Sequence, residues 1–112
     1  MRQAIRRGEI WWVCLDPARG SEIRKTRPCV VVSAEQINRQ RRTPIVVPLS
    51  AAPDAAPPVV VSVPSAGGDS VAVVDQVRAL DKSRFIRTSG SLSPEAMATV
   101  ESVLRRVLAW PD

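Results

Sequence analysis

The sequence has no histidine and only two cysteines among its 112 residues. Because Cys14 and Cys29 do not form a CxxC pair and no imidazole is present, the usual zinc ligands are missing and we expect no metal site. Both cysteines lie in apolar, strand-like runs, which is typical of reduced core residues and not of a disulfide. No apolar stretch approaches the roughly 18 residues that span a bilayer, and no signal-type apolar segment follows Met1. These absences predict a cytoplasmic protein without metal or membrane association.

Positive charge is in excess, and almost all of it is arginine. The chain has 16 Lys and Arg against 11 Asp and Glu, and 14 of the 16 cations are Arg, for a net charge of +5. A guanidinium is a planar, bidentate donor that suits phosphate, so nucleic acid or an acidic protein is the natural partner. The same net charge is also compatible with plain solubility. The length predicts a single domain over residues 1–112.

Short apolar runs rich in β-branched residues predict a mainly β fold. The runs are residues 10–15, 29–33, 44–50, 59–63 and 71–74. The run 44–50 is continuously apolar instead of alternating, so we expect this strand to be buried on both faces. The last two runs flank Gly67-Gly68-Asp69, which permits the sharp turn of an antiparallel hairpin. Strands of this length suit a small barrel.

Two helical segments and one irregular loop are also expected. Ser33 is a candidate cap for a short helical turn over residues 34–38, and Ser93 followed by Pro94 is a typical start of a C-terminal helix. Residues 51–58 contain three prolines and predict an exposed irregular loop. In the C-terminal helix the apolar side chains recur at helical spacing and form a stripe for packing on the sheet. The stripe consists of Met97, Val100, Val103, Leu104, Val107 and Leu108.

Two polar segments are candidates for function. Residues 20–28 join the first two predicted strands and place a carboxylate, a hydroxyl and three cations close together. Residues 75–84 alternate polar and apolar side chains, which is typical of an extended chain with one core face. Taken alone, each segment also has an ordinary interpretation, as a solvated strand connection and as a charged edge strand.

Taken together, the segments resemble the MazF/PemK family of toxins from bacterial toxin–antitoxin pairs. The resemblance covers most of residues 7–84 and depends on several short motifs in the family's order. The motifs are Arg7-Gly8-Glu9-Ile10-Trp11, Leu15-Asp16-Pro17, Gly20-Ser21-Glu22, Thr26-Arg27-Pro28-Cys29-Val30-Val31-Val32-Ser33, Asn38-Arg39, Val46-Val47-Pro48-Leu49, and Asp75-Gln76-Val77-Arg78 with Asp81-Lys82. The resemblance implies a homodimer of small SH3-like β-barrels (the PemK/CcdB-type fold), each with a C-terminal helix.

The resemblance also implies an activity: sequence-selective, metal-independent endoribonuclease cleavage of single-stranded RNA, without a cofactor. The substrate would be messenger RNA, with ribosomal or transfer RNA as alternatives. Attack of the 2′-OH on the adjacent phosphorus would leave 2′,3′-cyclic phosphate and 5′-OH ends. A cognate antitoxin is expected to silence the toxin by placing an acidic, largely disordered tail in the RNA groove.

Three residues are the candidate catalytic groups. Arg27 matches the family's arginine at the scissile phosphate, where its fork can hold two phosphate oxygens. Ser50 stands where the family commonly has a catalytic Thr, and its hydroxyl can bond the phosphate or the attacking oxygen. Glu22 matches an acidic residue implicated in some members and is a more conventional base than a guanidinium, which stays protonated. A strand-end Ser50 and a loop-ordering Glu22 are the alternatives.

A second set of polar residues is expected to contact RNA. It comprises Arg24, Lys25, Asp75, Gln76, Arg78 and Lys82. Some relatives have a His at the position of Ser21 and an Arg at the position of Val73, so an acid–base scheme built on that His does not apply here. Adjacent Trp11 and Trp12 face opposite sides of a strand, so only one is core and the other is available for the groove or for packing.

Two other functions use the same scaffold. A toxin with this barrel poisons DNA gyrase by binding protein without cutting anything, and a relative that binds RNA without catalysis is also conceivable. A protein that only binds gyrase does not require Arg27, Ser50 and Glu22 together, so these three residues favour the nuclease over it, whereas the missing His and Ser50 keep the non-catalytic relative as an alternative.

Overall fold

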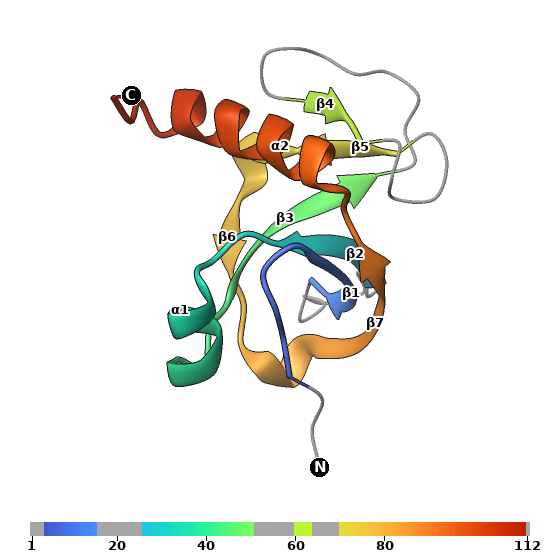
Figure 1. Cartoon of the computed structure of the whole chain (residues 1–112). Coiled ribbons are helices and arrows are strands. Elements are labelled where there is room, and N and C mark those ends of the chain that lie inside the picture. Colours follow the sequence, from blue (N-terminus) through green and yellow to red (C-terminus); the bar gives the residue numbers. More distant parts are fainter. Residues whose placement is uncertain (1–3, 16–25, 51–59, 64–69, 112) are drawn as a thin grey trace, which may run out of the picture.

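The computed structural model describes residues 4–15, 26–50, 60–63 and 70–111 (Figure 1). These residues form mainly strands, together with two α-helices and two short 3-10 turns. In chain order the elements are β1 (Glu9–Cys14), β2 (Thr26–Val31), α1 (Glu35–Gln40), β3 (Ile45–Ser50), β4 (Val60–Ser62), β5 (Val71–Val73), η2 (Val74–Gln76), β6 (Arg78–Ala79), η3 (Lys82–Arg84), β7 (Phe85–Ser91) and α2 (Pro94–Val107). The predicted mainly β fold with a C-terminal helix is confirmed, as is the hairpin of β4 and β5.

Strand β3 is the centre of the sheet. The strand order is β4-β5-β3-β2-β1-β7, and β6 also pairs with β3. The two ends of β3 have different partners on the edge away from β2, because Ile45 and Val46 pair with β6 whereas Leu49 and Ser50 pair with β5. The sheet therefore curls around β3, as Figure 1 shows, although the described strands do not close into a complete barrel.

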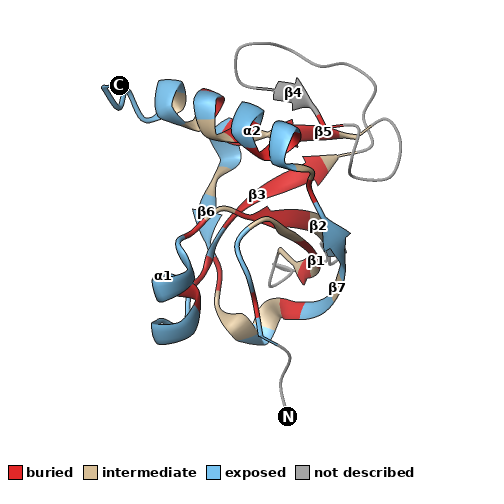
Figure 2. Cartoon of the chain, in the orientation of Figure 1, coloured by how far each residue is buried: buried red, intermediate tan, exposed pale blue. Residues whose placement is uncertain are grey.

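The central strands separate two apolar cores, because successive side chains of a strand point to opposite faces. The outer core lies under α2 and comprises Ile10, Val30, Val47, Leu49, Val63, Ala72, Val74, Leu92, Ala96, Met97, Val100 and Val103. The inner core fills the curl of the sheet and comprises Ile5, Trp11, Val13, Cys29, Val31, Val46, Leu80 and Phe85. In Figure 2 the buried residues accordingly cover most of β3 and the second half of β2, which confirms that β3 is buried on both faces.

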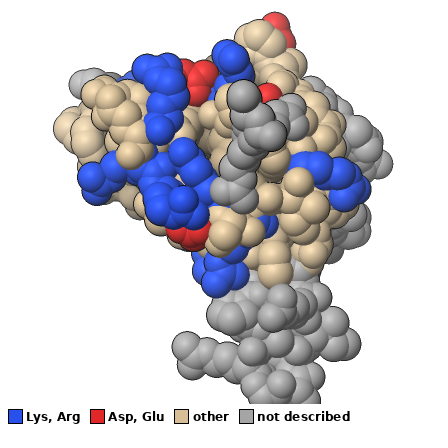
Figure 3. All heavy atoms as spheres, turned by 90° about the horizontal axis from the view of Figure 1, so that it is seen from below, with Lys and Arg blue, Asp and Glu red and all other residues tan. Residues whose placement is uncertain are grey.

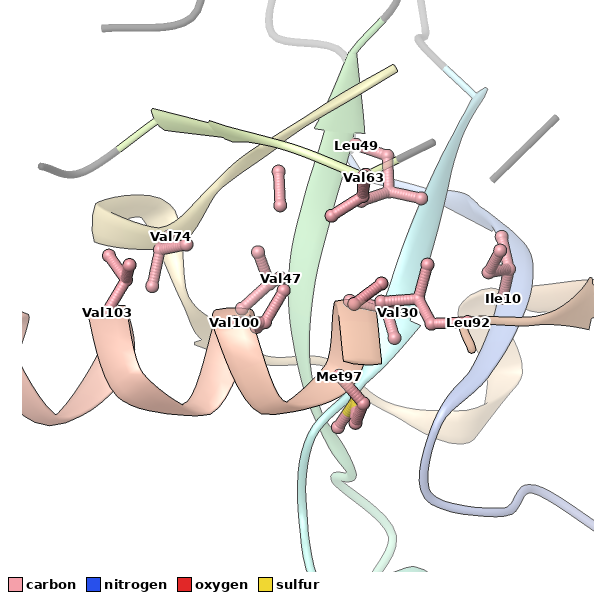
Figure 4. Close-up of a cluster of buried hydrophobic side chains, with 12 residues drawn as sticks. Ile10, Val30, Val47, Leu49, Val63, Val74, Leu92, Met97, Val100 and Val103 are labelled. Atoms are coloured by element: carbon pink, nitrogen blue, oxygen red, sulfur yellow. The ribbon is translucent and has the colours of Figure 1, made fainter. Parts of the chain in front are cut away.

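Helix α2 covers the outer core. The Ser93 Oγ accepts the N–H of Ala96 at 3.1 Å and Pro94 opens the helix, as predicted. Met97, Val100 and Val103 point from the helix toward the sheet (Figure 4). Complete burial of a side chain such as Val100 contributes about 1.5–3 kcal/mol. A serine cap contributes only about 1 kcal/mol, so packing is the larger of these two contributions to holding α2.

Strand β2 begins earlier than predicted, at Thr26, so Arg27 lies on a strand and not in the preceding loop. Arg27 pairs with Val13 and Pro28 with Trp12, whereas pairing of β2 with β3 starts only at Cys29. Proline has no N–H for a second ladder and is tolerated where only one strand is adjacent. The strand predicted from residue 29 therefore begins before Pro28, which the sequence pattern indicates as its boundary.

The prediction that Ser33 caps the first helix is wrong. Its hydroxyl donates to Oδ1 of Asn38 and accepts the N–H of Ile45 at 2.9 Å. Ser33 and Asn38 are both buried, so these hydrogen bonds satisfy groups that water cannot reach. The N-cap residue of α1 is Ala34, and the helix continues to Gln40, two residues beyond the predicted end.

Residues 75–84 do not form one extended strand. Only Arg78 and Ala79 pair with β3, between the 3-10 turns η2 and η3. The chain has to pass from the Ser50 end of β3, where β5 pairs, to the Ile45 end, where β6 pairs, and the two turns make this passage. Strand β7 is not predicted by the sequence, because within it only Phe85 is buried and the alternation is lost.

Candidate active site

A groove of about 330 Å³ lies where β1 ends, β2 begins and β3 ends. Antiparallel pairing puts the start of β2 beside the end of β3, so Arg27 and Ser50 enter the same groove from neighbouring strands. Both side chains are half-buried. The full lining is Leu15, Arg27, Pro48, Leu49, Ser50, Val73 and Gln76. The structure thus brings together two of the three predicted catalytic residues.

The groove lies at the edge of the inner core, where the strand faces become polar. Arg27 shares a strand face with Cys29, and Ser50 shares one with Val46, and both Cys29 and Val46 are fully buried in that core. The same face therefore changes from apolar to polar at the end of each strand. Leu15 and Pro48 form part of an apolar wall beside the guanidinium and the hydroxyl. Leu15 and Pro48 are not among the predicted site residues, although the two-residue strand period places them on the same strand faces as Val13 and Ser50.

A second cation lies close to Arg27. The positive charges of Arg27, two residues away on β2, and of Arg78 on β6 both act on the thiol of Cys29. Burial nevertheless outweighs the two guanidinium groups and raises the pKa of Cys29 to about 12. The thiol therefore stays protonated and makes a weak hydrogen bond to the carbonyl of Arg27 at 3.9 Å. Cys29 is a core residue, as predicted, and not a nucleophile, whereas Cys14 is only half-buried.

The predicted RNA-contacting residues divide into three groups. Gln76, at the end of η2, lines the groove. Asp75 and Arg78 are exposed next to it, and Lys82 is half-buried farther along the chain in η3. Glu22, Arg24 and Lys25 lie outside the described residues, so their roles stay predictions.

A bidentate ion pair holds the η3 region against the turn before β3. Arg42 donates from Nε and Nη2 to the two carboxylate oxygens of Asp81, at 3.2 and 3.1 Å. Backbone bonds run alongside, from Lys82 N–H to the carbonyl of Arg42 at 2.8 Å and from Leu80 N–H to that of Pro44 at 3.0 Å. Asp81 also accepts the N–H of Ser83 and so caps η3. Together these bonds fix the position of Lys82.

The two adjacent tryptophans have different surroundings. Trp11 is buried in the inner core and meets Phe85 edge to face, with ring centroids 5.8 Å apart. Trp12 is half-buried, and the guanidinium of Arg87 lies over its ring at 5.3 Å. Trp12 does not line the groove, so of the two predicted roles for the second tryptophan the structure supports packing.

A second hollow, of about 240 Å³, lies against the C-terminal half of α2. It includes the ion pair of Arg7 with Glu101 at 3.1 Å and the largely exposed Trp110. None of the predicted site residues lines it. None of the described helices has the length and apolarity needed to cross a membrane.

Comparison with known proteins assigns the chain to a family. Residues 6–108 match the family described as PemK-like, MazF-like toxin of type II toxin–antitoxin systems, and the chain belongs to this family. It is 36% identical over 110 residues to the endoribonuclease MazF9 of Mycobacterium tuberculosis, covering 90% of this chain and 93% of that protein. It is 48% identical over 46 residues to the endoribonuclease PemK of Escherichia coli, covering 41% of this chain and 35% of PemK.

Solved structures have the same fold. The MazE–MazF structure (Form-II) from Deinococcus radiodurans matches with a TM-score of 0.86 and 23% identity, over 98% of this chain and 100% of that one. A mycobacterial endoribonuclease in complex with its cognate antitoxin matches with a TM-score of 0.80 and 21% identity, over 99% of both chains. The predicted fold class is therefore confirmed.

The Arg42–Asp81 pair makes stability depend on pH in acid. Asp81 accepts hydrogen bonds from Arg42, which have the largest effect, and from Ser83. These bonds hold the pKa of Asp81 well below the usual range for an aspartate. Because the folded-state pKa is the lower one, the stabilisation is complete above the unfolded value of about 4 and is lost as the pH falls below it. Asp81→Asn should therefore lower the Tm at pH 7, and its difference from the parent protein should shrink as the pH falls below about 4. Thermal unfolding followed by circular dichroism measures this.

Asp75→Asn is the matched control, because Asp75 is exposed and belongs to neither ion pair of the described residues. A Tm difference for Asp81→Asn that stays constant down to pH 2 would contradict the role given to the carboxylate.

Proposed function

We propose that this protein is the toxin of a type II toxin–antitoxin pair and that it cleaves single-stranded RNA as a sequence-selective endoribonuclease. Two relatives, MazF9 and PemK, are named endoribonucleases, and the family model spans residues 6–108. The observation that carries the proposal is the groove, in which a guanidinium and a hydroxyl from two strands face the same space beside an apolar wall. This arrangement suits a phosphate with its attached sugar and base.

In the proposed reaction the RNA supplies its own nucleophile. The 2′-oxygen attacks the adjacent phosphorus and loses its proton, while the bond from phosphorus to the 5′-oxygen breaks and that oxygen gains a proton. The products carry a 2′,3′-cyclic phosphate and a 5′-OH. The protein has to position the phosphate, stabilise the added negative charge and move protons.

Arg27 has the central role in this proposal. Its fork can hold two phosphate oxygens as negative charge develops, an effect of about 3–4 kcal/mol in comparable sites. The hydroxyl of Ser50 can donate to the phosphate or orient the 2′-OH. Glu22, which precedes β2 in the chain, is proposed as the base.

The remaining polar residues are proposed to hold the substrate. Gln76 lines the groove and is placed to bond a base edge or the sugar. The residues proposed to contact the RNA around the cut are Arg24, Lys25, Asp75, Arg78 and Lys82. We also propose that residues 1–112 form one domain, that the protein acts as a cytoplasmic homodimer, and that a cognate antitoxin with an acidic tail silences it.

The direct test is to incubate the purified protein with RNA of mixed sequence in EDTA and to map the ends of the products. We expect discrete cuts at a short common sequence, with cyclic phosphate and 5′-OH ends, because the proposed groups need no metal. Intact RNA in the presence of a folded protein would contradict the proposed function. Cuts that require added Mg²⁺ would contradict the mechanism.

Replacing Arg27 tests the phosphate contact. Arg27→Gln should lower the rate of cleavage about 100- to 1,000-fold, because it removes the groove's bidentate donor for the developing charge. Single-turnover cleavage at one mapped site measures this. The matched control is Arg106→Gln, which removes an exposed charge in the last turn of α2. Equal rates for Arg27→Gln and Arg106→Gln would remove Arg27 from the mechanism.

Replacing Ser50 tests the hydroxyl. Ser50→Ala should slow cleavage, whereas Ser50→Thr should retain it or increase it, because Thr keeps the oxygen and restricts its rotation. Both variants are measured in the same single-turnover assay, with the Tm recorded for each. If alanine supported the same rate as serine, the side chain would be only a strand-end residue.

A further inference from the structure

A cluster of cations occupies the surface along α1, the turn that follows it and η3. We call it the basic face, and it consists of Arg6, Arg39, Arg41, Arg42, Lys82 and Arg84. Arg6 and Arg39 both act electrostatically on Glu35, so the N-terminal segment lies close to α1. The backbone bond from Lys82 to Arg42 joins η3 to the turn after α1. Figure 3, a view from below Figure 1, shows Lys and Arg side chains gathered on one side of this surface.

Among the described residues, Arg42 is the one member of the basic face that belongs to an ion pair. Two carboxylates beside the basic face accept hydrogen bonds from uncharged donors. Glu9 accepts the backbone N–H of Arg6 and the indole N–H of Trp11. Glu35 accepts the backbone N–H of Arg7 and the side-chain amide of Asn38. Asp81 pairs with Arg42. Within the described part of the chain neither Arg39 nor Arg41 belongs to an ion pair, and both are exposed.

The basic face is continuous with the groove along η3. Arg84 donates from Nη1 to the carbonyl of Cys14 at 3.2 Å, and the next residue, Leu15, lines the groove. Arg39 and Arg41 lie toward the Ile45 end of β3, whereas Ser50 is at its other end. At about 3.3 Å per residue these ends are about 17 Å apart, so a ligand that only fills the groove does not reach Arg39 or Arg41.

From this arrangement, and on the basis of the proposed nuclease function, we infer that the basic face binds the phosphate backbone of the RNA outside the cut site. Guanidinium groups without ion-pair partners supply bidentate donors for phosphates but read no bases. The basic face thus adds affinity for long RNA without changing the cleaved sequence. The fixed Arg42–Asp81 pair and its backbone bonds provide the frame that holds Lys82 and the end of α1 together.

The test compares two RNAs that share one mapped cut site: a minimal oligonucleotide confined to the site, and the same site with unstructured flanks on both sides. The variant Arg39→Gln/Arg41→Gln should cleave the minimal RNA at the parental rate. On the flanked RNA its KM should rise severalfold with kcat unchanged. The salt dependence of binding should also fall, by about 1.4 in the log–log slope, since each phosphate contact on a single strand contributes about 0.7.

The control is Arg105→Gln/Arg106→Gln, which also removes two charges from the last turn of a helix, but on α2. It should behave like the parent on both RNAs, and all three proteins should have the same Tm. Equal KM values of parent and variant on the flanked RNA would overturn the inference, as would equal losses on both RNAs. Weakened binding of a poly-glutamate peptide with unchanged binding of flanked RNA would assign the basic face to an acidic protein segment instead.

Failure of the basic face and failure of the nuclease proposal give different results. If the parent protein cuts neither RNA, the proposed function is wrong. If the parent cuts both and the variant matches it on both, only the inference about the basic face is wrong.

Discussion

Burial of β3 on both faces is the constraint on which the rest of the structure depends. Val47 and Leu49 complete the core under α2, while Val46 completes the core inside the curl. Because one edge of β3 is shared between β6 and β5, the sheet has to curl at this strand. The curl in turn opens a groove at the Ser50 end, where the inner face becomes polar. Packing therefore determines the location of the groove as well as the fold.

The environment of each side chain near the groove determines whether that side chain is charged or neutral. The thiol of Cys29 is close to two guanidinium groups, yet burial keeps it protonated, so proximity to positive charge does not make it a nucleophile. The chain has no imidazole, and in our proposal guanidinium and hydroxyl groups stabilise the charge while Glu22 acts as the base. The RNA would supply its own nucleophile, the 2′-OH. The reaction asks mainly for positioning and electrostatic stabilisation.

The basic face and the groove differ in kind. Half-buried Arg27 lies beside an apolar wall, where a charge-assisted hydrogen bond is strong. Arg39 and Arg41 lie in solvent, where each contact is weak and sensitive to salt. The first environment suits chemistry on one phosphate, and the second suits retention of a long polyanion. The excess of arginine in the composition thus serves two separate purposes in our proposals.

The sequence by itself determined the order of most strands, the start of α2 and the two-sided burial of β3, because proline punctuation, serine capping and hydrophobic periodicity are local signals. Its motifs also identified the family and predicted Arg27, Ser50 and Gln76 as site residues, and the structure places these three along one groove. Only the tertiary structure decided that Arg27 lies on a strand, that residues 75–84 are broken by two turns, and that Leu15 and Pro48 complete the groove. These features depend on which strand edges meet. Register between distant segments is set by the packing of both cores together, and no local pattern contains it.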